Sequence, residues 1–260
     1  MRAAFFLLLG LPFCAAAEQE APPFVTTPDE VVERMLELAG TAPGDVVIDL
    51  GSGDGRIVIA AAQKFGARGV GIELDARLEA RLRENARLAN VAERVAFMRG
   101  DVLLADIGEA SVVTLYLLPQ LIDRLQPRLL SELQPGTRIV SHAFGMTGWR
   151  PDRSETVRLA QRHALQGDES RIFLWIVPAS ARGEWQAADV RITVHQNFQE
   201  IEVEGSVGQR PLAGHGRIAG RDIGWEGRGA RFRGRVEGSR MVGELMLDGR
   251  AEQVVLSRNR

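Results

Sequence analysis

Three glycines and an acid occupy alternate positions in the stretch DVVIDLGSGDGRIVIAAA, residues 45–62. Gly51, Gly53 and Gly55 follow Asp49 at the end of a run of apolar residues. Glycine at such a point permits a positive φ and lets a ligand lie against the backbone. Because open α/β sheets bind ligands at the carboxyl ends of their strands, the stretch predicts a binding loop between a strand and a helix.

The spacing of these residues favours one kind of cofactor. A dinucleotide loop has the pattern G-x-G-x-x-G, whose last glycine would fall at Arg56. The observed D-x-G-x-G-x-G suits a cofactor without a pyrophosphate. Glu73, 22 residues beyond Gly51, ends the next predicted strand and can accept hydrogen bonds from both hydroxyls of a ribose. Asp101 ends the third strand and can accept a hydrogen bond from an adenine amino group, with Val102 beside it.

The glycine loop, the ribose acid and the adenine acid therefore fall in order at the ends of three successive strands. This order predicts an S-adenosylmethionine site, and glycines that serve only a tight turn are the alternative. The predicted cofactor-binding residues are Asp49, Gly51, Ser52, Gly53, Asp54, Gly55, Glu73, Asp101 and Val102.

A methyl acceptor is expected beyond the fourth and fifth strands, where Thr114, Tyr116 and His142 are the candidate catalytic residues. The ring of Tyr116 can wall an amine channel while its hydroxyl donates or accepts, although buried tyrosines are as often structural. His142 can act as a base near neutral pH, or it can be a structural histidine. A lysine amine must lose its proton before it attacks a methyl group, and burial favours the neutral amine.

The elements that position these residues alternate along the chain. Continuous apolar strands separated by amphipathic helices indicate a parallel sheet covered on both faces. The last two strands, 154–160 and 171–177, have no room for a crossover helix and must pair antiparallel. The other predicted strands are 46–50, 69–74, 95–100, 111–118 and 137–144, and the helices are 56–65, 76–90 and 120–133, the last interrupted at Pro127.

An amphipathic helix is predicted before the first strand, in TTPDEVVERMLELAG. Thr27 is the expected cap, Pro28 fits the first turn and Glu30 completes a capping box. Gly40 is the expected stop.

Composition changes over the last third of the chain. From Gly183 onward there is no helical period, and GRIAGRDIGWE (216–226) matches GRVEGSRMVGE (234–244) at an offset of 18. Each copy predicts a hairpin that turns near Gly220 or Gly238. The tail is therefore predicted to be a small antiparallel β domain, a meander or a partly closed barrel. The repeat either marks a ligand cavity or reflects hairpins that are built alike.

Composition and motifs exclude several function classes. The net charge of -2 over 260 residues gives no reason to expect a nucleic-acid partner, and no basic, aromatic-rich face is visible. The four histidines lack zinc spacing, so no metal is expected. A G-x-S-x-G nucleophile elbow is also absent from the sequence.

Residues 1–17 have the layout of a secretory signal peptide, with one basic residue, an apolar stretch from Ala3 and small residues at Ala15 and Ala17. Cys14, the only cysteine, would leave with it. We therefore expect an exported, periplasmic protein. An uncleaved membrane anchor is the alternative, although the stretch is short for a span of about 20 residues. Since the cofactor is made in the cytoplasm, an exported binding module without turnover stays open as a second function.

Residues 22–178 resemble the class I S-adenosylmethionine-dependent methyltransferases. Within them they are similar to the mitochondrial lysine methyltransferases of the ATP synthase c-subunit and the adenine nucleotide translocase, and to bacterial relatives. The similar stretches are FVTTPDEVVERML (24–36), VVIDLGSGDGRIVIAA (46–61), GVGIELD (69–75), RVAFMRGD (94–101), VVTLYLLP (112–119) and PGTRIVSHAFGM (135–146). Thr26 stands where the family has a proline, and Ala143 where it commonly has an acid.

The resemblance implies a Rossmann-like α/β fold with a seven-stranded, mostly parallel methyltransferase sheet and S-adenosyl-L-methionine as cofactor. It also implies transfer to a protein lysine, with membrane proteins among the substrates; a small-molecule methyltransferase is the alternative. The expected organisation is a signal peptide (1–17), a methyltransferase domain (22–178) and a small antiparallel β domain (183–260).

Overall fold

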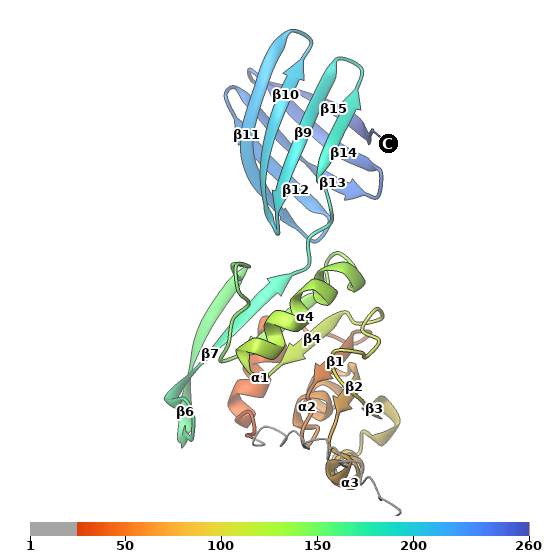
Figure 1. The fold of residues 1–260 in the computed structure, drawn as a ribbon, viewed down its shortest axis with the longest axis vertical. Coiled ribbons are helices and arrows are strands. Elements are labelled where there is room, and N and C mark those ends of the chain that lie inside the picture. The colour runs from red at the N-terminus through yellow and green to blue at the C-terminus, as the bar shows by residue number, and fades with distance from the viewer. Residues whose placement is uncertain (1–24, 260) are drawn as a thin grey trace, which may run out of the picture.

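The computed structural model describes residues 25–259, and it contains an α/β sheet domain followed by a β-barrel (Figure 1). The predicted fold class is confirmed. The signal-peptide prediction falls on residues outside the described part of the chain. Among residues 25–259, no helix is both long and apolar enough to cross a bilayer.

The sheet has seven strands in the order β3-β2-β1-β4-β5-β7-β6. The five strands from β1 to β5 run parallel, and β7 is antiparallel to both β5 and β6, as predicted. The strands are β1 (Val46–Leu50), β2 (Arg68–Glu73), β3 (Val95–Arg99), β4 (Val112–Leu115), β5 (Arg138–His142), β6 (Arg153–His163) and β7 (Gly167–Ile176). The helices are α1 (Asp29–Leu38), α2 (Arg56–Phe65), α3 (Glu79–Leu88) and α4 (Pro119–Glu132), with short 3-10 turns at Ala76–Leu78 and Ala92–Arg94.

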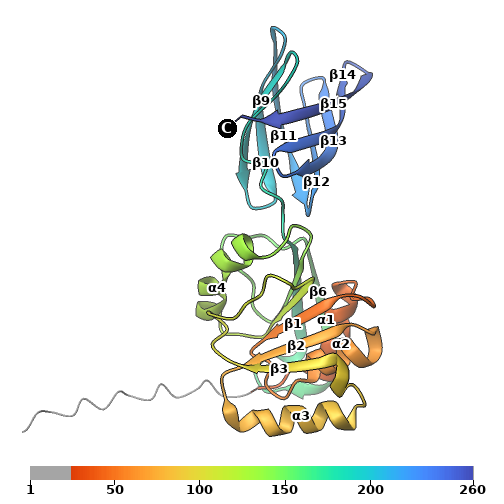
Figure 2. The ribbon, with the colours of Figure 1, turned by 90° about the vertical axis from the view of Figure 1, so that its right-hand side faces the viewer.

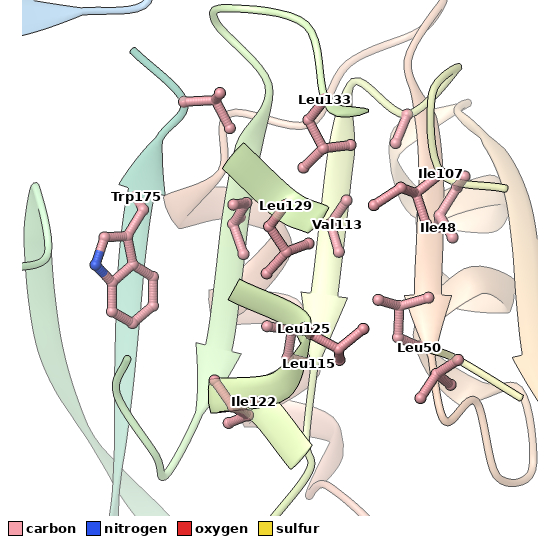
Figure 3. Packing of buried hydrophobic residues seen from close by; sticks show 14 of the residues in the cluster. Ile48, Leu50, Ile107, Val113, Leu115, Ile122, Leu125, Leu129, Leu133 and Trp175 are labelled. Atoms are coloured by element: carbon pink, nitrogen blue, oxygen red, sulfur yellow. The ribbon is translucent and has the colours of Figure 1, made fainter. Parts of the chain in front are cut away.

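Helices cover both faces of this sheet because its strands are apolar at consecutive positions. Ile48 and Leu50 of β1 belong to the cluster that α4 covers, whereas Val47 between them belongs to the cluster of α1 and α2. Successive side chains of a strand point to opposite faces, so each strand contributes to two cores. Figure 3 shows the α4 side, where Leu125 and Leu129 lie against the sheet.

The predicted interruption of the fourth helix is wrong, because α4 runs unbroken through Pro127. Proline removes one helical hydrogen bond and crowds the preceding turn. Ile122, Leu125 and Leu129 share one face of the helix, and each is fully buried against the sheet. Burial of an aliphatic side chain contributes about 1.5–3 kcal/mol, and three such side chains offset the cost of the proline.

The predicted cap of the first helix is also wrong. Pro28 occupies the N-cap position and no side chain caps the helix. The Thr27 hydroxyl lies 3.1 Å from Nδ1 of His142, and the Glu30 carboxylate accepts a hydrogen bond from the Ala160 amide. Both side chains therefore bond to distant strands, which compete with the local capping box.

The barrel is closed by eight antiparallel strands in the order β10-β11-β12-β13-β14-β15-β8-β9. The two predicted hairpins are confirmed as β11–β12 and β13–β14, which turn at Gly220 and Gly238 with φ of 59° and 63°. Trp225 and Phe232 stack inside an apolar core. The strands are β8 (Gly183–Ala187), β9 (Val190–Asn197), β10 (Glu200–Val207), β11 (Arg210–Ala219), β12 (Asp222–Gly227), β13 (Ala230–Glu237), β14 (Arg240–Leu247) and β15 (Arg250–Arg258).

The barrel docks on the edge of the sheet at which the parallel strands begin (Figures 1 and 2). Phe198, in the β9–β10 turn, stacks on Trp149 with ring centroids 5.3 Å apart and an interplanar angle of 5°. The Gln199 side-chain amide donates to the Arg150 carbonyl at 2.6 Å, and Arg217 pairs with Asp152. The carboxyl ends of the parallel strands, where ligands are expected, therefore lie at the opposite end of the sheet.

Candidate active site

The glycine loop joins β1 to α2 and is fixed to the neighbouring strand. Gly51, Gly53 and Gly55 have φ of 84°, 55° and 79°, which confirms the prediction of positive φ. The amides of Gly51 and Ser52 both donate to the carbonyl of Ile72 at 2.9 Å. The loop therefore has a set shape before any ligand binds.

Protein atoms, as well as backbone geometry, exclude side chains from this loop. A Cβ at Gly51 would lie 2.8 Å from the side chain of Leu117, and one at Gly55 would lie 2.9 Å from the ring of Phe97. The glycines thus let the loop pack closely on β3 and on the segment after β4, in addition to the ligand contact that the sequence predicted.

Glu73 lies beside the loop at the end of β2. Its Oε2 accepts a hydrogen bond from the Gly53 amide at 2.8 Å, and its Oε1 accepts one from the Asp75 amide at 2.9 Å. Each carboxylate oxygen has a second lone pair, so the group can still accept hydrogen bonds from ribose hydroxyls. A small hollow at this position is lined by Glu73, Asp75, Ala76, Glu79, Leu82, Phe97, Met98 and Arg99. Acidic, apolar, aromatic and basic side chains therefore lie together beside Glu73.

Asp49 is a buried carboxyl group directly before the loop, and it is 2% exposed. Its pKa is raised to about 7, mainly by burial and in smaller part by the charges of Glu73 and Asp54, while the Thr114 hydroxyl, which donates at 2.7 Å, lowers it. Such a group is stabilised by a nearby cation. S-adenosylmethionine carries a sulfonium and an ammonium, so the residues present fit this cofactor. The buried Ser52 hydroxyl, in the glycine loop itself, has no hydrogen-bond partner among the described residues.

Thr114 is fully buried behind the loop and bonds to Asp49. The structure therefore places it among the cofactor-side residues, away from the acceptor position that the sequence predicted for it. Asp54, predicted to bind cofactor, directs its carboxylate to Arg56 with an Nη2–Oδ2 distance of 2.7 Å. Burial raises the pKa of Asp54, but this pairing holds it below its ordinary value overall.

The two residues predicted at the adenine end lie after β3. Asp101 is exposed, and its Oδ1 accepts a hydrogen bond from the Leu103 amide at 2.9 Å. Val102 is 8% exposed and belongs to the sheet core. Asp101 thus faces solvent on the same edge of the sheet as Glu73.

Three aromatic rings meet at the acceptor side of this edge. The centroids of Tyr116 and His142 lie 4.1 Å apart, and His163 lies 6.3 Å and 6.0 Å from them. They come from the segment after β4 and from the ends of β5 and β6, which the antiparallel β6–β7 hairpin brings together. Sequence reasoning predicted the first two, while His163 has no motif that marks it.

His142 is fully buried with both ring nitrogens near polar partners. Nδ1 lies 3.1 Å from the Thr27 hydroxyl, and Nε2 lies 3.2 Å from the Ser170 hydroxyl. Burial lowers the pKa of His142 to about 4, and the charge of His163 acts in the same direction. A ring with a pKa of about 4 is a weak base, and both of its nitrogens already contact hydroxyl groups, which favours a structural role over the general base considered from the sequence.

The Tyr116 hydroxyl is buried and has no hydrogen-bond partner of good geometry in the described part of the chain. Burial raises the pKa of Tyr116, and the nearby amide of Gln166 opposes this shift. A buried hydroxyl without a partner costs about 1–3 kcal/mol, so the Tyr116 hydroxyl is available to a polar group that enters this side of the site.

The segment before α1 connects the two halves of the site. The Thr27 carbonyl accepts a hydrogen bond from Arg56 at 2.8 Å, and its hydroxyl bonds to His142. The Thr26 carbonyl lies 3.2 Å from Nε2 of His163. Sequence reasoning treated Thr27 as a helix cap and so missed this link between the cofactor loop and the acceptor side.

A further hollow, of about 650 Å³, does not belong to this site. It lies on the barrel next to His195 and His215, and Asn197 and Glu200 beside the β9–β10 turn also line it. Within residues 25–259, no group of three His, Cys, Asp or Glu side chains is arranged to hold a metal ion.

Comparisons with known proteins give the family. The model of the ANTKMT methyltransferase domain matches residues 49–153. A protein-lysine N-methyltransferase from Saccharolobus islandicus is 45% identical over 133 residues, which are 50% of this chain and 81% of that protein. The adenine nucleotide translocase lysine N-methyltransferase of Mus musculus is 36% identical over 129 residues, and the chain spans only 56% of its length.

Among solved structures, a crystal structure of an RNA methyltransferase from Salinibacter ruber in complex with S-adenosyl-L-homocysteine is 51% identical. It has a TM-score of 0.54, and the match covers 60% of this chain and 95% of that one. The cofactor predicted from the three strand ends is confirmed as S-adenosyl-L-methionine. The chain belongs to the family of S-adenosylmethionine-dependent methyltransferases that includes these protein-lysine N-methyltransferases.

Proposed function

We propose that the protein transfers the methyl group of S-adenosylmethionine to the side-chain amine of a protein lysine. The observation that carries this proposal is the buried hydroxyl of Tyr116, which has no hydrogen-bond partner among residues 25–259. The relatives from Saccharolobus islandicus and mouse, both lysine N-methyltransferases, support the same substrate class.

The cofactor supplies a methyl group bonded to a positively charged sulfur, which an amine nitrogen displaces in line. The chain's own residues hold the reactants and exclude water. Asp49, Glu73 and the glycine loop would hold the cofactor. The amine would take the methyl carbon, and the electrons of the carbon–sulfur bond would stay with the departing sulfur.

The acceptor side favours the neutral amine that this reaction needs. The rings of Tyr116, His142 and His163 form a weakly polar wall, and desolvation disfavours an ammonium. The amine therefore releases its proton to solvent as it enters. The Tyr116 hydroxyl can then accept a hydrogen bond from an amine N–H, which leaves the lone pair free to attack.

The test is to incubate purified protein with labelled S-adenosylmethionine and separate protein, RNA and small-molecule fractions of a cell extract. We expect label on protein, in methyllysine after acid hydrolysis. Tyr116→Phe should keep cofactor affinity and lower kcat at least tenfold, while Leu118→Ala, a change at an exposed neighbour, should leave both within twofold. Label confined to RNA or to small molecules would overturn the lysine proposal, and affinity without turnover would indicate a binding module.

Export is a separate proposal that rests on the sequence of residues 1–17 alone. Cleavage after Ala17 would deliver the protein to the periplasm, and retention of the segment would anchor it to a membrane. N-terminal sequencing of protein from its native source distinguishes these outcomes, since a chain that still starts at Met1 refutes cleavage.

A further inference from the structure

The β6–β7 hairpin brings residues to the acceptor side that no motif marks. β6 ends at His163 and β7 begins at Gly167, and the turn between them extends away from the barrel (Figure 1). Gln166, in this turn, places its amide nitrogen 3.0 Å from Nε2 of His142. The hydroxyl of Ser170, on β7, lies 3.2 Å from the same nitrogen.

The contact with Gln166 favours one position of the proton on the His142 ring. A side-chain amide nitrogen is a donor only, so it requires Nε2 of His142 to be an acceptor. In a neutral imidazole the proton then lies on Nδ1. Nδ1 lies 3.1 Å from the Thr27 hydroxyl, which can accept that proton. The hydrogen bonds on the two sides of the ring are therefore mutually consistent.

The second residue of the acceptor wall packs on this imidazole. The Tyr116 ring lies against His142 with centroids 4.1 Å apart, so the orientation of the imidazole bears on the position of the Tyr116 ring and of the hydroxyl that it carries.

We propose that Gln166 is a positioning residue of the methyl-acceptor site, which fixes His142 in its Nδ1–H form and thereby holds the Tyr116 hydroxyl in place for the incoming amine. This inference rests on the proposed function for the role of Tyr116. It assigns to the antiparallel hairpin a part in acceptor binding, in addition to its part in completing the sheet.

The hairpin supplies a matched control for this role. Gln161, on β6, is exposed and has the same side chain. Gln161→Glu therefore adds the same charge to the same hairpin as Gln166→Glu, without touching the His142 ring. Gln166→Met keeps the length of the side chain and removes only its polar atoms.

The experiment combines nitrogen NMR of the imidazole with steady-state kinetics. In wild-type protein we expect ¹⁵N shifts that show a protonated Nδ1 and a bare Nε2 on His142. Gln166→Glu should replace the donor by a carboxylate, shift the titration of His142 toward neutral pH, and lower kcat/KM for the acceptor at least tenfold. Gln166→Met should give a mixture of the two neutral forms. Cofactor affinity should stay within twofold, and Gln161→Glu should change nothing.

Results that differ from these expectations distinguish a failure of the inference from a failure of the proposed function. A protonated Nε2 in the wild type, or unchanged ¹⁵N shifts and kinetics in Gln166→Glu, would refute the positioning role. Loss of cofactor affinity together with acceptor turnover would show a general disruption and refute it as well. If the NMR results are as expected but no protein lysine is methylated, the lysine proposal fails while the control of the His142 tautomer stands.

Discussion

At the scale of single residues, the site contains two buried titratable groups with opposite preferences. Burial raises the pKa of the Asp49 carboxyl and lowers the pKa of the His142 imidazole, because it disfavours the charged form of each. Both groups are therefore uncharged over part of the neutral range, and each ties a measurable property to pH.

Asp49 should make cofactor affinity depend on pH. A cationic cofactor favours the ionised carboxylate, and with a pKa of about 7 the ionised fraction rises from about a tenth at pH 6 to about nine tenths at pH 8. We expect the affinity of wild-type protein to rise about tenfold over this interval. Asp49→Asn is the control, because any ionisation of the cofactor itself affects both proteins equally. In calorimetric titrations the variant should bind more weakly, and its affinity should depend less on pH. Parallel plots of affinity against pH would contradict the assignment.

His142 should make stability fall in acid. Its folded pKa of about 4 is below the unfolded value of 6.5, so between these values the unfolded chain binds a proton that the folded chain does not. The stability it contributes is present above pH 6.5 and is lost as pH falls toward 4. Wild type should thus lose up to about 3 kcal/mol relative to His142→Gln over this range. Denaturant titrations at several pH values measure the free energy of unfolding of both proteins. The same dependence of this free energy on pH in both would refute the prediction.

At this scale the sequence predicted the residue types on the cofactor side, but few of the residues that hydrogen-bond to them and hold them in place. Glycine at positive φ and an acid at a strand end follow from local rules, and both were found. Thr114 behind Asp49 and Gln166 beside His142 depend on contacts between distant segments. No local pattern distinguishes such residues from other polar side chains.

At the scale of elements, the site forms where the predicted strands end early. The apolar run after Ser111 predicted one strand over 111–118, yet β4 ends at Leu115. Tyr116 lies just beyond that strand, at the acceptor side, and Leu118 is 52% exposed at the start of α4. Apolar pattern alone could not locate this boundary, because the residues after it are as apolar as the strand.

The junction of the loop with α2 should be sensitive to one methyl group. In Gly55→Ala the new Cβ would lie 2.9 Å from the Phe97 ring, at a φ of 79°. Gly40→Ala has a similar φ of 61° and open space around it, so it controls for backbone strain. We expect Gly55→Ala to destabilise the protein by about 1–3 kcal/mol more than the control, as overpacking does.

Thermal unfolding and calorimetric titration of both variants provide the check. Gly55→Ala should also bind cofactor more weakly, since the loop must move to relieve the contact. Equal melting temperatures for the two variants would show that Phe97 yields without cost.

At the scale of the whole molecule, the barrel and the candidate site lie at opposite ends of the sheet. The barrel packs where the parallel strands begin, and the site lies where they end. The sequence predicted a β domain and its two hairpins correctly. It left closure open, because the final pairing joins Ser257 and Arg258 of β15 to β8, about 70 residues earlier in the chain.

Phe198 should stabilise the junction without affecting the site. Phe198→Ala removes its stack on Trp149 and should cost about 2 kcal/mol, since the ring is half-buried. Cofactor affinity should be unchanged. Val255→Ala, at a barrel position that is 45% exposed, should lower the melting temperature far less. A loss of cofactor affinity in Phe198→Ala would show that the junction communicates with the site.

The contacts of Thr26 and Thr27 have a practical consequence. These residues lie at the beginning of the described chain and touch both the glycine-loop helix and the histidines of the acceptor side. A purification handle fused just ahead of Val25 would therefore emerge beside the reaction centre and compete with a macromolecular substrate for access. The carboxyl terminus, on the barrel, is the safer point for immobilisation, because a surface attached there leaves the candidate site pointing outward.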